Sequence, residues 1–140
     1  MFFSKMRKDD AFGFIVFDNN ARTLIPLMKK SEINEDHLFE IVKKQTAQGG
    51  NVFPAAFAEA ETNMMNYLEK YAKVSDGNME NRIVLMTDVC DSEIGQADQF
   101  ISKVENSGIH ATIIGISEDF RSENCERMNE VKGFNYFCAT

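Results

Sequence analysis

Residues 82–88 read RIVLMTD, an apolar run that ends in a threonine and an aspartate. Apolar side chains at both odd and even positions predict a strand covered on both faces, as in the centre of a parallel sheet. Such a strand needs a neighbour on each side. On either side of it the sequence alternates between strand-length and helix-length segments, which predicts a doubly wound α/β fold.

Further strands and helices follow from periodicity and turn residues. Pro26 makes residues 21–27 an edge strand, and Asn34 is a suitable N-cap for a helix that continues to Gln48. The other expected strands are residues 12–17, 109–116 and 134–138. The other expected helices are residues 1–8 (the last turns of one), Pro54 to about Tyr71, 93–106, and the polar segment 118–131.

Composition limits the class of protein. The chain has 140 residues, 44% of them hydrophobic, and a net charge of −7. This size predicts one domain over residues 1–140, and the acidic balance argues against nucleic-acid binding. We expect no membrane span, because no run approaches the ~20 apolar residues that one needs. Three cysteines without metal-ligand spacing favour a reducing compartment, so we expect a cytoplasmic or other intracellular protein.

Acidic side chains follow several of the predicted strands. In doubly wound sheets ligands bind outside the carboxyl ends of the strands, and Gly49-Gly50-Asn51, between two helices, is a candidate for the same rim. Clustered oxygen ligands suit Mg²⁺ or Ca²⁺ better than zinc. The acidic candidates are Asp18, Asp88, Asp91 and Asp119, the last beside Ser117 and Glu118.

Five segments, in this order, resemble successive blocks of a von Willebrand factor type A domain. They are FGFIVFDNNARTLIPL (12–27), QGGNVFPAAF (48–57), NRIVLMTD (81–88), SGIHATIIGISEDF (107–120) and GFNYF (133–137). The resemblance begins at about Lys5. It implies a Rossmann-like, mostly parallel sheet with helices on both faces and a metal ion-dependent adhesion site at the rim.

In the family that site is built from three loops, and this sequence departs from the pattern in each. The Asp-x-Ser-x-Ser loop and the first, central strand before it are absent, so we expect a domain truncated at its N-terminus. Asn51 stands where a threonine is usual, and Val89 replaces the glycine after Asp88. The resemblance therefore implies a degenerate site, with Asp88 and Asn51 as metal ligands, Asp18, Asp91 and Asp119 around them, and Mg²⁺ bound weakly or not at all.

Both ligand candidates also have ordinary structural interpretations. Asp88 could accept hydrogen bonds from the backbone amides of residues 91–93, and Asn51 could cap the helix that begins near Pro54. Cys90 with His37 or His110 would suggest a hydrolase, but we expect His37 to face solvent and His110 to be half-buried in a strand. We expect no enzyme.

The resemblance implies a protein–protein interaction module within a larger protein or complex. A partner could supply an acidic ligand to the metal, or a strand. In the family the absent strand lies between residues 12–17 and 82–88, so these two strands either pair directly, accept a strand from another chain, or leave the domain poorly stable. The alternative function is a receiver-like phosphorylation switch on Asp88.

Overall fold

The computed structural model describes residues 3–46, 49–50, 52–71, 80–88, 94–116 and 130–138. The elements in chain order are η1 (Phe3–Lys5), β1 (Ala11–Phe17), β2 (Ala21–Lys29), η2 (Lys30–Glu32), α1 (Glu35–Lys43), α2 (Phe53–Tyr71), β3 (Arg82–Thr87), α3 (Ile94–Ser107), β4 (His110–Gly115) and β5 (Phe134–Cys138). The expected alternation of strands and helices is confirmed for these elements. The helix expected over residues 118–131 lies mostly outside the described residues.

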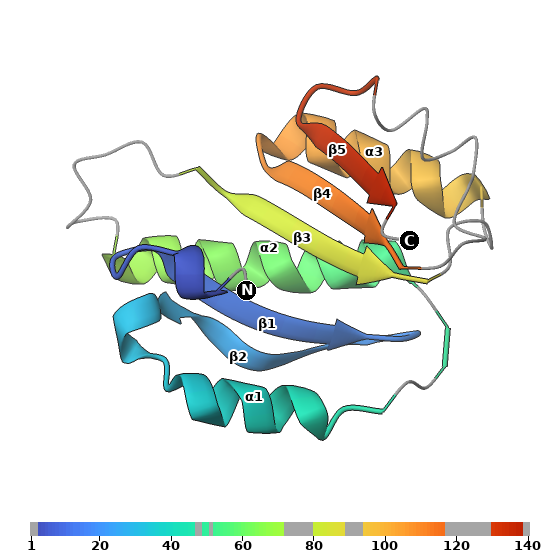
Figure 1. The fold of residues 1–140 in the computed structure, drawn as a ribbon. Coiled ribbons are helices and arrows are strands. Elements are labelled where there is room, and N and C mark those ends of the chain that lie inside the picture. The colour runs from blue at the N-terminus through green and yellow to red at the C-terminus, as the bar shows by residue number, and fades with distance from the viewer. Residues whose placement is uncertain are drawn as a thin grey trace.

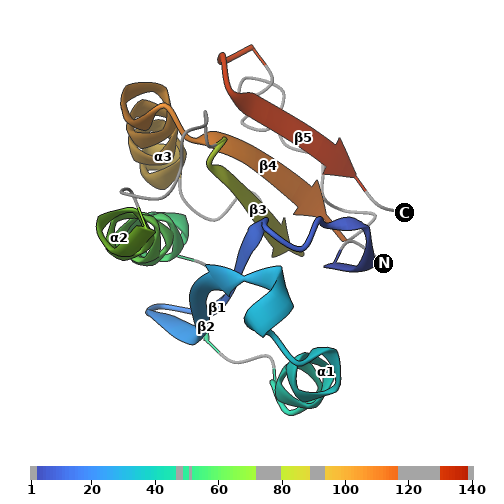
Figure 2. The same cartoon turned by 90° about the vertical axis from the view of Figure 1, so that its left-hand side faces the viewer.

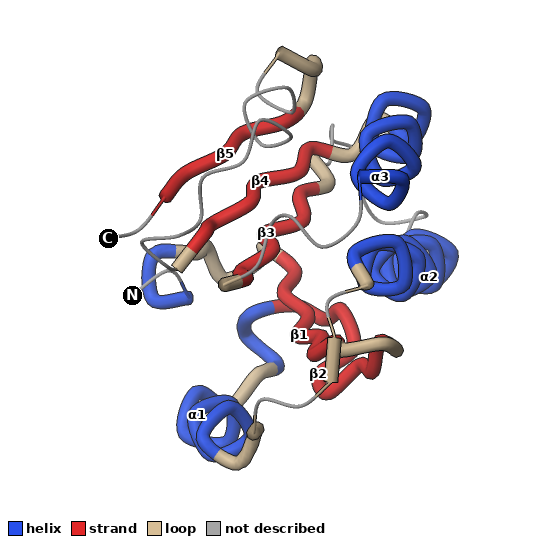
Figure 3. The backbone as a smooth tube through the Cα atoms, turned by 90° about the vertical axis from the view of Figure 1, so that its right-hand side faces the viewer, coloured by secondary structure: helices blue, strands red, loops and turns tan. Residues whose placement is uncertain are grey.

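The strands form two separate sheets. β3, β4 and β5 make a parallel sheet in that order, and β1 and β2 make an antiparallel pair. Helices α2 and α3 lie on one side of the strands, whereas α1 lies on the other side, next to the β1–β2 pair (Figures 2 and 3). This arrangement is the expected α/β fold with helices on both faces.

The position of β3 corrects the sequence-based expectation of a neighbour on each side. Among the described strands, β3 is hydrogen-bonded to β4 alone, and β1 is hydrogen-bonded to β2 alone. Direct pairing of β1 with β3 was one of the three alternatives expected from the sequence, and it does not occur. The two strands run in roughly the same direction in Figure 1.

Burial of the strands follows the number of neighbours that each one has. β4 lies between two strands, and its residues 111–113 and Gly115 are buried. β1 is continuously apolar from Phe12 to Phe17, yet every residue in it stays half-buried. In β3, Val84 is 40% exposed and Met86 is 59% exposed. The two strands with one neighbour each thus leave apolar side chains in contact with solvent.

Helix α2 connects the two sheets through one apolar core. Phe53, Ala56 and Phe57 of α2 form a cluster with Leu85 of β3 and with buried residues of α3, β4 and β5. Phe17 of β1 packs against the same cluster, and its ring meets that of Phe53 edge-on at 6.0 Å between centroids. Burial of these side chains provides the main stabilising free energy, since apolar burial dominates folding.

A second, smaller core lies beneath α1. Phe3, Ile25 and Leu38 are buried together, and Asn34 caps α1 as predicted by accepting a hydrogen bond from the backbone N–H of His37 at 3.1 Å. The predicted end at Gln48 is wrong, because α1 ends at Lys43. Only Leu38 of this helix is buried, so little apolar contact supports a longer one.

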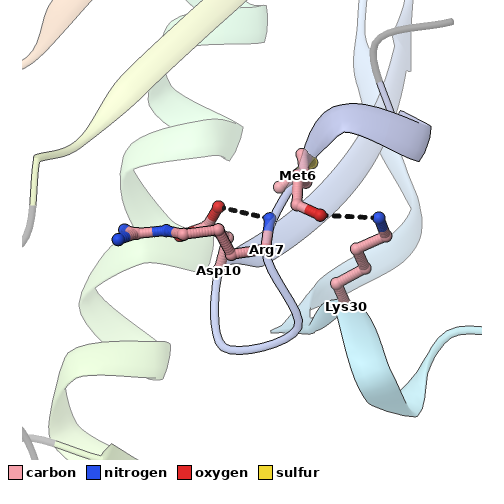
Figure 4. Close-up of polar contacts among 4 residues, drawn as sticks. All are labelled: Met6, Arg7, Asp10 and Lys30. Carbon is pink, nitrogen blue, oxygen red and sulfur yellow. Dashed lines mark hydrogen bonds and ion pairs between the residues drawn. The ribbon is translucent and has the colours of Figure 1, made fainter.

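The N-terminal segment is a single 3₁₀ turn, η1, instead of the predicted helix over residues 1–8. Tertiary contacts from Lys30 hold this turn. Its ammonium donates to the backbone oxygen of Met6 at 2.7 Å (Figure 4) and to that of Ser4 at 3.2 Å. It also lies 5.2 Å from the centre of the Phe3 ring. Carbonyls that a longer helix would use internally are thereby satisfied from η2.

Pro26 lies in β2 at the edge of its sheet, as predicted. The β1–β2 register shifts around Phe14, whose partner is Ile25, and Phe12 pairs with Met28. Gly13 sits opposite this irregularity, where a Cβ atom would lie 3.2 Å from the backbone nitrogen of Leu27. A bulge and a glycine together accommodate a proline that cannot donate to the ladder.

Truncation of Phe57 is expected to destabilise the whole domain. Its side chain is 1% exposed, and a buried Phe→Ala change costs about 3–5 kcal/mol. Met65, on the same helix, is 57% exposed, so Met65→Ala should change the free energy of unfolding by less than about 0.5 kcal/mol. Urea denaturation of both variants checks this, and equal effects would contradict the assignment of the core.

Asp10 is expected to contribute stability that depends on pH. Its carboxylate accepts hydrogen bonds from the Arg7 side chain and backbone N–H (Figure 4), and these lower the pKa of Asp10. The contribution is therefore present above the unfolded-state pKa of about 4 and is lost as the pH falls through the lower folded-state value. Thermal melts should show Asp10→Asn destabilised at pH 6 but close to wild type at pH 2, with Asp9→Asn as the control.

Candidate functional site

The carboxyl ends of β1 and β3 meet the same edge of the molecule, as Figure 1 shows. Thr87, the last residue of β3, is 4% exposed. Asp88 follows it and is exposed. Successive residues of an extended chain point to opposite faces, so a buried Thr87 can be followed directly by an exposed Asp88. Asp88 therefore presents a carboxylate to solvent at this rim.

Asp18 lies at the end of β1 and is held by its own turn. The backbone N–H of Asn20 donates to Asp18 Oδ1 at 2.8 Å, and the backbone N–H of Asp18 donates to the backbone oxygen of Asn20 at 2.9 Å. This hydrogen bond to the backbone two residues on is the usual role of aspartate in a turn. Asp18 thus shapes the β1–β2 hairpin, which accounts for one of its carboxylate oxygens.

The Gly-Gly turn reaches the same rim, as the sequence indicated. The backbone N–H of Val52 donates to the backbone oxygen of Asp18 at 2.9 Å. A Cβ atom on Gly49 would lie 3.0 Å from the Cβ of Asp18, and one on Gly50 would lie 2.5 Å from the side-chain oxygen of Asn19. Gly49 also has φ +71°, so glycine is needed both for close approach and for backbone conformation.

The remaining predicted site residues, Asn51, Asp91 and Asp119, lie outside the described residues. The approach of Asn51 to Asp88 therefore stays a prediction. The same holds for the structural interpretations of the two residues, Asn51 as a helix cap and Asp88 as an acceptor from the backbone amides of residues 91–93. In the described parts of the chain, no group of three or more acidic, histidine or cysteine side chains could hold a metal ion. An octahedral Mg²⁺ ion needs several oxygens fixed at once, and the described rim carboxylates, Asp18 and Asp88, do not provide such a set.

The two histidines have the environments that the sequence predicted. His37 is exposed in the first turn of α1, and His110 is half-buried in β4. Cys90 lies outside the described residues, so a Cys–His pair is not tested. His37 belongs to α1, whereas His110 is the first residue of β4 in the three-stranded sheet.

A polar contact between β2 and α2 was not anticipated from the sequence. Asn63 donates to Thr23 Oγ1 at 2.8 Å and to the Glu59 backbone oxygen at 2.9 Å, and Thr23 donates to the Glu59 carboxylate. The spacing of Glu59 and Asn63, four residues apart on one helix face, is the only local signal for it. These partly buried groups fix β2 on α2 and thereby position the hairpin that carries Asp18.

Comparison with known proteins identifies the family. The family model described as the von Willebrand factor type A domain matches residues 2–140, and no curated protein matches. A structure of a von Willebrand factor type A protein from Catenulispora acidiphila is similar over 99% of this chain, with TM-score 0.76 and 15% identity. An aerotolerance-related membrane protein from Bacteroides fragilis, solved with multiple mutations to serine, gives TM-score 0.65 and 19% identity over 99% of this chain and 75% of its own.

This chain spans 32% of the length of the Catenulispora structure. At these identities the two structures establish the fold. Within the described residues, no helix is long and apolar enough to cross a membrane. The match of the family model over nearly the whole sequence, together with the layered α/β fold and the position of the Gly-Gly turn beside the rim, shows that the chain belongs to the von Willebrand factor type A domain family.

Proposed function

We propose that this chain is a protein–protein interaction module that contacts its partner at the carboxyl-end rim. It serves as a binding part of a larger protein or complex and does not catalyse a reaction. The observation that carries the proposal is the exposure of Asp88 directly after the buried Thr87, at the edge where Asp18 and the Gly-Gly turn pack together. Membership of the family supports the same function.

Metal has a limited role in this proposal. Asp88 and Asn51 are the two candidate ligands, and two protein ligands plus water hold Mg²⁺ weakly. An acidic side chain of the partner would add a further ligand, so any metal affinity rises when the complex forms. Contacts to the rim by hydrogen bonds and charge pairs do not need the metal and carry most of the recognition.

Titration with Mg²⁺ is expected to stabilise the isolated chain very little. A dissociation constant of about 10 mM gives a stabilisation of only about 0.4 kcal/mol at 10 mM Mg²⁺, which corresponds to less than about 2 °C in melting temperature. Asp88→Asn should remove even that shift. Differential scanning fluorimetry checks the prediction. A rise of ten degrees or more, lost in Asp88→Asn, would show a complete metal site and contradict its degeneracy.

Reversal of charge at the rim is expected to abolish partner binding. Asp88→Arg should remove the proteins that co-purify with the tagged full-length protein from its own cells, whereas Glu105→Arg should retain them. Glu105 is an equally charged, exposed residue on α3, at the end of that helix which precedes the amino end of β4. Quantitative mass spectrometry compares the two variants.

Equal recovery of partners by both variants would count against the rim as the binding surface. Incorporation of phosphate from labelled acetyl phosphate, lost in Asp88→Asn, would instead support the receiver-like switch. That outcome would replace the proposed function.

A further inference from the structure

A groove lies between β2 and α1, the helix at the edge of the molecule in Figure 2. Its volume is about 260 Å³, and most of its lining is apolar. Sites for whole small molecules are typically about 300–1,000 Å³, whereas the anchor of a protein interface is one large side chain in a pocket. The groove therefore has the size for a side chain of a partner polypeptide. Its apolar lining residues are Leu24, Ile25, Pro26, Met28, Ile33 and Ile41.

Irregular pairing of β2 shapes one wall of the groove. The β1–β2 register skips Leu24 and Pro26. Extra residues of this kind bend a strand and re-aim its side chains, and both residues line the groove. Ile25, between them, is 7% exposed and belongs to the small core beneath α1. The groove thus has a buried floor, and its wall follows from the register of the two strands.

Acidic side chains border the groove. Glu32 lines it directly, as does His37. Glu40 lies three positions after His37, and Asp36 lies four positions before Glu40, so these side chains are neighbours along one strip of α1. The carboxylates of Glu32, Asp36 and Glu40 are all exposed. Within the described residues, none of these three carboxylates forms an ion pair.

Two ordinary explanations account for only part of this acidic border. The helix dipole favours acidic residues in the first turn of α1, where Asp36 lies, whereas Glu32 and Glu40 lie outside that turn. Pairing with nearby lysines does not account for the other two. In the described part of the chain, Glu40 forms no ion pair with the lysines at the end of α1, and Lys30 is bound to backbone carbonyls of the N-terminal segment. The border therefore offers negative charge to a partner.

We propose that the groove binds a segment of a partner protein in which one large apolar side chain is flanked by lysine or arginine. The apolar side chain fills the space over Ile25, and the basic residues pair with Glu32 and Glu40. A second copy of the chain, with its net charge of −7, and an anionic membrane or nucleic acid would be repelled by the same carboxylates. The inference rests on the proposed interaction function, but it adds a contact surface other than the rim.

Selection of peptides provides the test. A phage library of random peptides of about ten residues is selected against the full chain. The bound peptides should share a leucine, methionine or phenylalanine with lysine or arginine close to it. In fluorescence anisotropy, the best of them, made with a fluorescent label, should bind saturably. Replacement of its apolar side chain by serine should weaken binding about tenfold or more, and a rise in NaCl from about 50 mM to about 500 mM should also weaken it.

Variants of the chain locate the binding site. Glu32→Lys combined with Glu40→Lys reverses the charge beside the groove and should weaken binding of the selected peptide about tenfold or more. Glu69→Lys combined with Glu105→Lys makes the same change in net charge on exposed residues of α2 and α3, and it should change the affinity less than about threefold. Circular dichroism verifies that both double variants are folded.

A measurement on the unmodified chain locates the site without any substitution. On addition of the selected peptide, the methyl resonances of Ile33 and Ile41, which line the groove, should shift in nuclear magnetic resonance spectra. Those of Ile113, which is 1% exposed in the other core, should stay in place. If the double variants do not fold, these shifts still decide the question.

Each outcome has a definite meaning. Absence of enriched peptides, enriched peptides without basic residues, or equal affinity of the two double variants would overturn the proposal. A dimer in sedimentation that Glu32→Lys with Glu40→Lys dissociates would overturn it in favour of a second copy in the groove. Asp88→Arg should leave the affinity unchanged within about twofold. Loss of peptide binding in that variant would overturn the groove and leave the rim proposal standing, so the two failures are distinguishable.

Discussion

The packing of helix α2 against both sheets is the contact on which the rest of the structure depends. Phe53 and Phe57 bring Phe17 of β1 and Leu85 of β3 into one cluster although no backbone hydrogen bond links these two strands. Burial of apolar area is non-directional, so it can hold the sheets together without a shared ladder. The rim exists because this packing places the carboxyl ends of β1 and β3 at the same edge.

The divided sheet leaves two apolar strands with one neighbour each. A strand buried on both faces normally has neighbours on both sides, and exposed apolar edges are usually covered. In β1 and β3 an apolar sequence occurs together with incomplete burial. Local signals in the sequence fit the family fold, whereas β1 and β3 are not joined by backbone hydrogen bonds.

Most of the described elements could be predicted from the sequence, because their signals are local. Asn34 before α1 and Pro26 in β2 act within a few residues, and β5 has the predicted bounds. The N-terminal segment could not be predicted, because Lys30, more than twenty positions away, satisfies its carbonyls. The Gly-Gly turn was correctly placed at the rim, whereas the Thr23–Glu59–Asn63 contact depends on tertiary packing. The pairing of Asp88 with Asn51 stays a prediction.

Amide hydrogen exchange in the free chain, followed by nuclear magnetic resonance, tests the division of the sheet most directly. The account predicts alternating protection along β3: slow exchange for Ile83 and Leu85, whose N–H groups point to β4, and fast exchange for Val84 and Met86. β4 should show slow exchange at consecutive residues, because it has a neighbour on each side. Equally slow exchange at all four residues of β3 would show that its second edge is paired, and would contradict the account.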